Sequence, residues 1–216
     1  WIKLLIINSL EKCDIFWITY APVHDLEISY ILRDLLVSKS NKNRLFDFDI
    51  NKFIWTYTFN QYNPNDCSYG YRPIIRLIRN KKDKVKIYPK VIQEISGRKK
   101  LGDSRMANDG MKTPNNVWNF PRIISQSWER CNWMPTQLPI DLMKRIIALS
   151  IDLNQNENNK ETFVDLFGGS FSSLRAAIEL DRENKDISNY KERVKAVEIS
   201  PKTCLLGKQK IYGLDQ

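Results

Sequence analysis

Short apolar strands alternate with amphipathic helices along most of this 216-residue chain, and this alternation constrains the fold more than any other feature. Segments rich in β-branched and aromatic residues predict strands over residues 13–22, 52–59, 73–79, 162–167 and 194–200. Apolar residues at helical spacing predict helices over 1–11, 25–36 and 136–151, and two more that begin near residue 172 and at Pro201. Such alternation favours an α/β fold with a mostly parallel twisted sheet and helices on both faces.

Length and composition predict a single domain over residues 1–216. With 42% hydrophobic residues, the chain can bury the core of one α/β domain. Four cysteines without C-x-x-C pairs and a single histidine predict reduced cysteines in a cytoplasmic protein, with no metal site. No apolar run is long enough to span a membrane, and the N-terminal segment has no signal-peptide cleavage site.

Residues 80–112 interrupt the apolar pattern and predict an exposed excursion from the core. The segment is basic, contains glycine and lacks apolar periodicity. The whole chain carries a net charge of +9, which favours a polyanionic partner. Cations in the excursion suit contacts with phosphate groups, and such binding weakens as salt rises. The alternative is a solvated charged loop without a partner.

The stretch ETFVDLFGGSFSSLRAAIEL (161–180) predicts a strand, a tight turn and a helix. Gly168 and Gly169 permit a left-handed backbone and close approach of a ligand. Ser172 or Ser173 is placed to cap the helix, whose first N–H groups make a slightly positive site at the end of the strand. Glu198 ends the next predicted strand, where a carboxylate can accept hydrogen bonds from both hydroxyls of a nucleoside ribose.

The same residues also fit an ordinary glycine turn with Glu198 as a surface acid, because short glycine motifs are weakly specific. Asp165 and Glu198 lie further apart than the usual separation of about 20 residues in dinucleotide-binding units, and the polar loop 181–193 can absorb the excess. A dinucleotide enzyme is disfavoured, because Phe171 stands where a pyrophosphate requires close backbone approach.

Three segments in order resemble the DNA amino-methyltransferases that use S-adenosylmethionine. They are NNVWNFPRI (115–123), ERCNWMPTQLPIDLMKRII (129–147) and FVDLFGGSFSS (163–173) with AVEIS (196–200). Their order resembles the β class, in which the target-base half precedes the cofactor half, and the resemblance covers residues 13–212. It implies a Rossmann-like methyltransferase fold, and in-line transfer of a methyl group to the exocyclic amino group of adenine or cytosine in double-stranded DNA.

The resemblance also implies site residues. The family's Asp-x-Phe-x-Gly-Ser cofactor loop is matched by Asp165, Phe167, Gly168, Gly169 and Ser170. Phe171 departs from the pattern, which has glycine there, so this side chain either covers the cofactor or obstructs its pocket.

Further positions follow from the same resemblance. Glu198 matches the family's ribose-binding acid, and Thr136 and Gln137 match the segment beside the methionine end of the cofactor. The excursion at 80–112 takes the place of the target-recognition region. The resulting DNA-binding candidates are Arg98, Lys99, Lys100 and Arg105.

The family's Asp-Pro-Pro-Tyr motif, which holds the flipped base and directs methyl transfer, does not occur in the sequence. The resemblance places it upstream of Trp1, so we expect an N-terminally incomplete enzyme whose catalytic residues lie outside these 216 positions. The alternative is a catalytically inactive DNA-binding or regulatory homologue on the same fold. The resemblance further implies S-adenosylmethionine as cofactor and a prokaryotic, phage or mobile-element setting, and it leaves open a homodimer.

Overall fold

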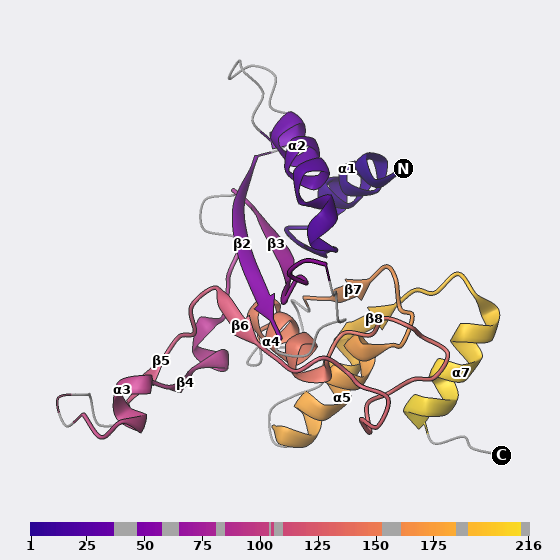
Figure 1. Cartoon of the computed structure of the whole chain (residues 1–216). Helices are drawn as coiled ribbons and strands as arrows, with labels where there is room; N and C mark the ends of the chain where they lie inside the picture. The colour runs from indigo at the N-terminus through magenta and orange to yellow at the C-terminus, as the bar shows by residue number, and fades with distance from the viewer. Residues whose placement is uncertain are drawn as a thin grey trace. The chain divides into compact units, whose positions relative to one another are not determined.

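The structure is a computed structural model in which the described residues form two compact units (Figure 1). The described residues are 1–36, 47–57, 65–80, 85–103, 105, 110–152, 161–184 and 190–212. Unit 1 combines Trp1–Lys86 with Pro114–Asn119, and unit 2 combines Ile87–Thr113 with Phe120–Gln216. The single domain over residues 1–216 stays a prediction. No helix in the described part of the chain has both the length and the apolar character needed to cross a membrane.

Unit 1 is built on a four-stranded sheet with the order β1-β3-β2-β6. The strands are β1 (Ile15–Thr19), β2 (Phe48–Thr56), β3 (Tyr71–Arg79) and β6 (Val117–Asn119). β3 runs antiparallel to β1 and β2, whereas β6 is parallel to β2. β2 and β3 are consecutive strands, and consecutive strands can form an antiparallel pair directly. β2 begins before the predicted residue 52, and residues 58 and 59 lie outside the described part.

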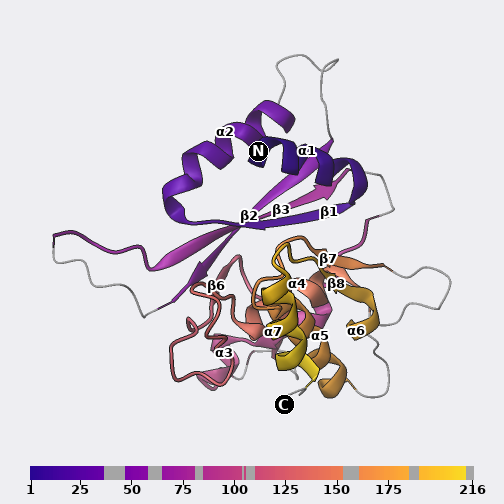
Figure 2. The ribbon, with the colours of Figure 1, turned by 90° about the vertical axis from the view of Figure 1, so that its right-hand side faces the viewer.

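Two helices cover one face of this sheet (Figure 2). They are α1 (Ile2–Lys12) and α2 (Asp25–Leu36), and the 3-10 turn η1 (Pro22–His24) leads into α2. The buried cluster comprises Ile6, Leu10, Tyr20, Ile28, Leu32, Leu35, Leu36, Phe48, Ile75 and Leu77. The apolar residues that recur at helical spacing in α1 and α2 thus pack against the alternate residues Ile75 and Leu77 of β3. This confirms both predicted helices.

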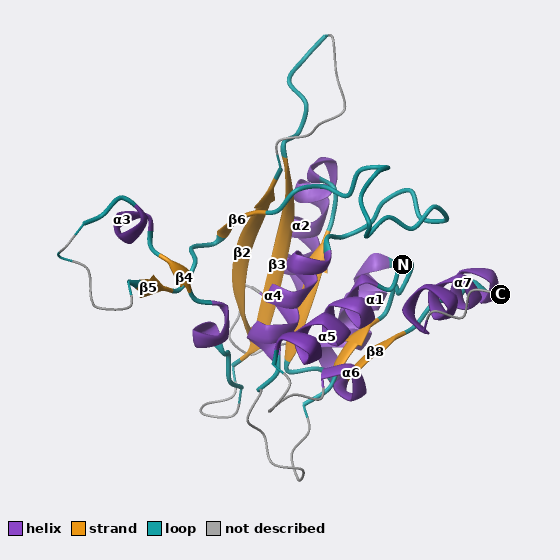
Figure 3. Cartoon of the chain, turned by 90° about the horizontal axis from the view of Figure 1, so that it is seen from below, coloured by secondary structure: helices purple, strands orange, loops and turns teal. Residues whose placement is uncertain are grey.

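Unit 2 contains two adjacent helices and a pair of parallel strands (Figure 3). The helices α4 (Ile140–Ser150) and α5 (Ser172–Glu183) pack against each other. The strands β7 (Phe163–Asp165) and β8 (Val194–Ala196) are joined through α5 and the short helix α6 (Tyr190–Arg193), as parallel neighbours require a crossover. The chain continues into α7 (Pro201–Tyr212). The predicted α/β class is confirmed. The expectation of a mostly parallel sheet is not met by the described strands, because β3 pairs antiparallel with β1 and β2, and β4 pairs antiparallel with β5, whereas β2–β6 and β7–β8 are parallel.

The basic excursion contains more regular structure than its sequence predicts. It includes η2 (Pro89–Ile92), α3 (Gly97–Lys100) and the antiparallel pair β4 (Glu94–Ile95) and β5 (Met111–Lys112). Tyr88 N donates to Leu149 O at 3.1 Å, which connects this segment to the end of α4. Residues 81–84, 104 and 106–109 of the excursion lie outside the described part.

Candidate functional site

Asp165 ends β7 and fixes the beginning of the glycine turn. Its Oδ1 accepts a hydrogen bond from Phe167 N at 3.0 Å, and its Oδ2 accepts one from Ser173 Oγ at 2.7 Å. One carboxylate therefore joins the end of the strand, the turn and the first turn of α5. This use of both oxygens explains why an acid suits the position even without a ligand.

Glu198 holds the middle of the same turn from the neighbouring strand. Its Oε2 accepts from Gly169 N at 2.8 Å, and its Oε1 accepts from Ser200 N at 2.9 Å. The backbone N–H groups of Ser200 and Gly169 lower the pKa of Glu198, so the side chain is ionised at neutral pH. Each oxygen keeps lone-pair capacity for a further donor. The structure thus brings the predicted residues Asp165, Gly169 and Glu198 together.

The turn itself depends on Gly169. This residue has φ +49°, a left-handed conformation that glycine adopts without steric cost. A Cβ there would lie 2.7 Å from Met134 Cε, closer than carbon atoms approach. Gly168 N donates to Val197 O at 2.7 Å, which lays the start of the turn along the end of β8.

The prediction that Ser172 or Ser173 caps α5 is wrong. The N-cap position is taken by Phe171, and no side chain caps the helix. Both serines lie after the cap, inside the first turn, so their hydroxyls bond elsewhere. Ser172 Oγ donates to Leu138 O at 2.7 Å and Ser173 Oγ donates to Asp165, while Ser170 Oγ lies 3.0 Å from Ser172 Oγ. Ser172 and Ser173 therefore connect the first turn of α5 to the segment before α4 and to the end of β7.

Phe171, the departure from the family pattern, is buried with 6% of its surface exposed. It adopts φ 55° and ψ 33°. A Cβ on Gly168 would lie 2.9 Å from its ring carbon Cε1, and a Cβ on Gly207 of α7 would overlap ring carbons Cδ2 and Cε2. The ring consequently packs between the turn and α7, a contact that neither predicted role anticipated.

The segment that contains Thr136 and Gln137 lies against this turn. Trp133 Nε1 donates to Gly169 O at 3.4 Å. Gln137 braces the segment from within, because its Oε1 accepts from Cys131 N at 3.0 Å and its Nε2 donates to Glu129 O at 2.7 Å. The side chain of Thr136 is exposed. The helix predicted from residue 136 accordingly begins only at Ile140, since the residues before it are held in this braced segment.

Glu129 and Arg175 form a connection that the sequence prediction missed. Glu129 Oε2 accepts from Ile140 N at 2.8 Å, and Glu129 O accepts from Arg175 Nη1 at 2.7 Å. Arg175 is 7% exposed, and its guanidinium lies 5.6 Å from the ring centre of Trp128. Burial raises the pKa of Glu129 above its usual value. The sequence did contain a signal for this connection, because Arg175 stands directly before Ala176 and Ala177 in the most apolar part of a predicted helix.

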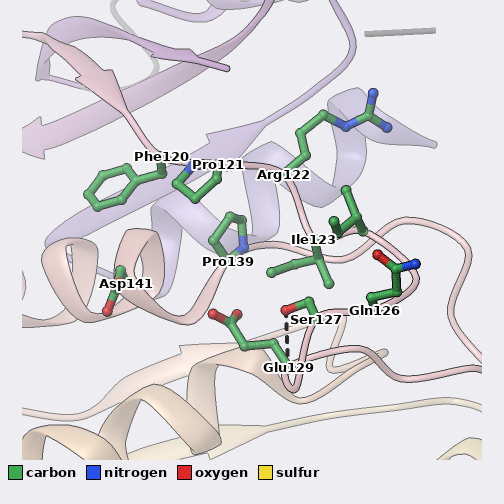
Figure 4. A pocket seen from close by; sticks show the side chains of 10 residues that line it. Phe120, Pro121, Arg122, Ile123, Gln126, Ser127, Glu129, Pro139 and Asp141 are labelled. Carbon is green, nitrogen blue, oxygen red and sulfur yellow. Dashed lines mark hydrogen bonds between the residues drawn. The ribbon is translucent and has the colours of Figure 1, made fainter. Parts of the chain in front are cut away.

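A pocket of about 300 Å³ lies beside Glu129 (Figure 4). It is lined by Phe120, Pro121, Arg122, Ile123, Ile124, Gln126, Ser127, Glu129, Pro139 and Asp141. None of the predicted cofactor residues belongs to this lining. The Arg145 guanidinium lies 4.8 Å from the ring centre of Phe120, so one wall of the pocket is stiffened by a cation–π contact.

Two exposed apolar side chains lie in sequence next to the residues of the turn. Phe167 is 65% exposed, and Ile199, directly after Glu198, is 97% exposed. Ile199 was not among the predicted site residues, although an apolar residue at the end of an apolar strand is a visible signal. A carboxylate with neighbouring exposed apolar surface suits a ligand that has hydroxyl groups and a flat apolar ring.

The predicted DNA-binding cations lie on and after α3. Ser96 caps this helix by accepting from Lys99 N at 3.2 Å, and the stem of Lys99 packs over Gly110. Arg105 Nε and Nη2 each donate to Asp103 at 3.0 Å, and Arg98 Nε lies 4.0 Å from the same carboxylate. Asp103 therefore draws two of the four predicted cations together, and Lys100 is exposed beside them.

Comparison with known proteins adds a family and a fold. A family model described as DNA methylase matches residues 10–209. The DNA adenine methyltransferase YhdJ of Escherichia coli (strain K12) is 38% identical over 84 residues, which are 39% of this chain and 26% of that protein. The match therefore spans about a quarter of the length of this relative.

Solved structures resemble the chain over a larger part of its length. The match to the crystal structure of the M1.HpyAVI-SAM complex has a TM-score of 0.55 at 13% sequence identity. It covers 91% of this chain and 74% of the M1.HpyAVI chain. The match to TTHA0409 of Thermus thermophilus has a TM-score of 0.50 at 15% sequence identity. It covers 91% of this chain and 69% of TTHA0409. At such identities the likeness concerns the fold alone, and it confirms the predicted Rossmann-like architecture.

Proposed function

Because the chain belongs to the DNA methylase family, we propose that it transfers a methyl group from S-adenosylmethionine to the exocyclic amino group of adenine or cytosine in DNA. The observation that supports this most directly is the bond between Gly169 N and Glu198 Oε2 at 2.8 Å. It places an ionised acid against a glycine turn at the carboxyl ends of two parallel strands, where ligands of open α/β sheets bind.

The residues around the turn fit a sulfonium nucleoside. Glu198 has lone pairs left for the two ribose hydroxyls, and the exposed side chains of Phe167 and Ile199 offer apolar surface to a purine ring. Asp165, the backbone of Gly168–Ser170 and the segment with Thr136 and Gln137 would hold the methionine part. The cofactor supplies the methyl group, and M1.HpyAVI has been crystallised as a complex with it.

Double-stranded DNA is the proposed substrate, and the excursion is its proposed contact surface. Arg98, Lys99, Lys100 and Arg105 would contact phosphate groups and set the orientation of the duplex. Their sign and their exposure on α3 and the residues after it support this assignment. Contacts of this kind carry no sequence information, so the proposal assigns them affinity rather than recognition of a particular site.

Calorimetric titration with S-adenosylmethionine tests the cofactor site. We expect the parent to bind, and we expect Asp165→Ala and Glu198→Ala each to weaken binding about tenfold or more, because each removes a charged hydrogen-bond acceptor. Glu11→Ala is the matched control, since it removes an exposed acid from α1. Absence of binding by the folded parent, or parental affinity in both variants, contradicts the proposal.

A second candidate is a catalytically inactive DNA-binding or regulatory homologue on the same fold. The observation that favours it is the absence of an Asp-Pro-Pro-Tyr motif from residues 1–216. Incubation of the chain, extended by any residues encoded upstream of Trp1, with DNA and S-adenosylmethionine labelled in its methyl group separates the two candidates. Label in the DNA supports the enzyme, whereas binding of both ligands without transfer supports the homologue.

A further inference from the structure

Phe171 stands out in the backbone of the described residues, where it is the one residue other than glycine with a positive φ. Side chains disfavour this left-handed conformation because Cβ crowds the backbone carbonyl. A residue held there requires a compensating contact. The compensation must come from the phenyl ring, because Phe171 has no side-chain hydrogen bond to offer.

The ring occupies a place that two glycines leave open. A Cβ on Gly168 would lie 2.9 Å from ring carbon Cε1. On α7, a Cβ on Gly207 would overlap the ring at Cδ2 and Cε2. Gly207 is itself buried in the helix, so the ring and the helix backbone are in direct contact. Any larger residue at position 207 displaces the ring.

The backbone of the same turn carries the bonds of the proposed cofactor site. Phe171 N donates to Gly168 O at 2.6 Å, and Gly168 N donates to Val197 O at 2.7 Å. Gly169 N, between them, donates to Glu198. Because these bonds are formed by neighbouring residues of one turn, a shift of Phe171 alters the orientation of the Gly169 amide.

We propose that Phe171 is a positioning residue, whose ring holds the turn in its left-handed form by packing against Gly207, and that cofactor affinity depends on this fit. The claim that cofactor affinity depends on this packing rests on the proposed function. The effect on the turn does not, because it is a property of the free protein. Phe171 thereby links α7 to Glu198 through the turn rather than by contact with the cofactor.

Amide hydrogen exchange in the free protein tests the structural part. We expect Gly207→Ala to accelerate exchange at Gly168, Gly169 and Phe171 about tenfold or more, because the added Cβ expels the ring. Gly97→Ala is the matched control, since a Cβ there meets no atom within 4 Å. Adding Gly207→Ala to Phe171→Ala should cause no further change, because the ring is already gone.

Unchanged exchange in Gly207→Ala, or an equal effect of Gly207→Ala with and without the ring, overturns the proposal. If Gly207→Ala does not fold, Phe171→Ala decides alone, because it removes the ring without adding an atom. Exchange at the parental rate in that variant is then the overturning result.

Calorimetry with S-adenosylmethionine tests the functional part on the same variants. We expect Gly207→Ala to bind about tenfold more weakly than the parent and Gly97→Ala to bind equally. Parental affinity in Gly207→Ala, despite faster exchange in the turn, overturns the link to the cofactor. If the parent itself does not bind, the proposed function fails, and the exchange result alone decides whether Phe171 positions the turn.

Discussion

Glu129 shows how one residue can support a site without belonging to its predicted surface. Its carboxylate accepts from the first N–H of α4, and its carbonyl accepts from Gln137 and Arg175. Burial raises the pKa of this carboxyl, and the bond from Ile140 and the nearby Arg175 oppose that rise without cancelling it. The ionised form is therefore less favourable in the folded chain than in the unfolded one.

This shift fixes the sign of a pH effect. Since the folded pKa lies above the unfolded value, the parent loses stability as pH rises from the unfolded pKa through the folded one. We expect Glu129→Gln to avoid that loss while still accepting from Ile140 N. Urea unfolding should show its stability relative to the parent increasing between about pH 4 and about pH 7.

Two controls accompany this measurement. Glu129→Ala also removes the acceptor at the start of α4 and should be about 1 kcal/mol less stable than Glu129→Gln at either pH. Glu179→Gln changes a carboxylate that pairs with Arg182 on the surface of α5, and it should leave the profile of the parent unchanged. A constant difference between Glu129→Gln and the parent across this range would contradict the assigned cause.

At the scale of elements, periodicity located the long helices because each buries a continuous stripe. α4 buries Leu142, Met143, Ile146 and Ile147, as its spacing predicts. The start of α4 was placed four residues too early, because hydrogen bonds from Gln137 and Ser172 hold the preceding residues in a non-helical conformation. α6 has only four residues, too few for any periodic signal.

Packing between elements is the part that local sequence does not encode. Gly207 lies in α7 and Phe171 before α5, and neither residue type alone indicates the other. The same holds for Arg175, whose partner at Glu129 is a backbone carbonyl from another segment. By contrast, Asp165, Gly169 and Glu198 were predicted together, since the carboxyl ends of adjacent parallel strands meet at one edge.

The link between α5 and residues 129–131 predicts a specific loss of stability. Arg175→Met keeps the bulk of the side chain but removes the donor to Glu129 O, which also accepts from Gln137 Nε2. We expect a loss of about 1.5–3 kcal/mol, the range for a hydrogen bond that involves a charged group. Urea unfolding at neutral pH measures it, beside Arg182→Met on the same helix.

Arg182 is the matched control because its guanidinium is largely exposed and pairs with Glu179 in the adjacent turn of the helix. Such surface pairs contribute little to stability. Equal stabilities of Arg175→Met and Arg182→Met would show that the buried donor has no special weight.

At the scale of the whole molecule, the net charge of +9 acts together with the distribution of cations. A general attraction for DNA depends on the net charge of the protein, whereas direct contact with DNA depends on which cations reach the phosphate groups. α3 presents three consecutive basic residues, Arg98, Lys99 and Lys100. The sequence identified this cluster, but the pairing of Arg98 and Arg105 with Asp103 became visible only in the structure.

Two triple variants of equal net charge separate contact from general attraction. We expect Arg98→Ala/Lys99→Ala/Lys100→Ala to weaken binding of a DNA duplex and to reduce the slope of log affinity against log salt by about 2.7, or about 0.9 for each lost phosphate contact. Lys191→Ala/Lys202→Ala/Lys208→Ala lowers the charge equally at exposed positions elsewhere and should retain the parental slope. Identical slopes in both variants would refute contact by α3.

The double engagement of Glu198 has a thermodynamic consequence. Its carboxylate is immobilised by two backbone donors as the chain folds, so the rotamer entropy of this side chain is lost before any ligand arrives. A ligand that bonds to Glu198 therefore meets a preorganised acceptor and avoids most of that ordering cost. Changes that move the backbone N–H groups of Gly169 or Ser200 away from the carboxylate would return this cost to the binding step.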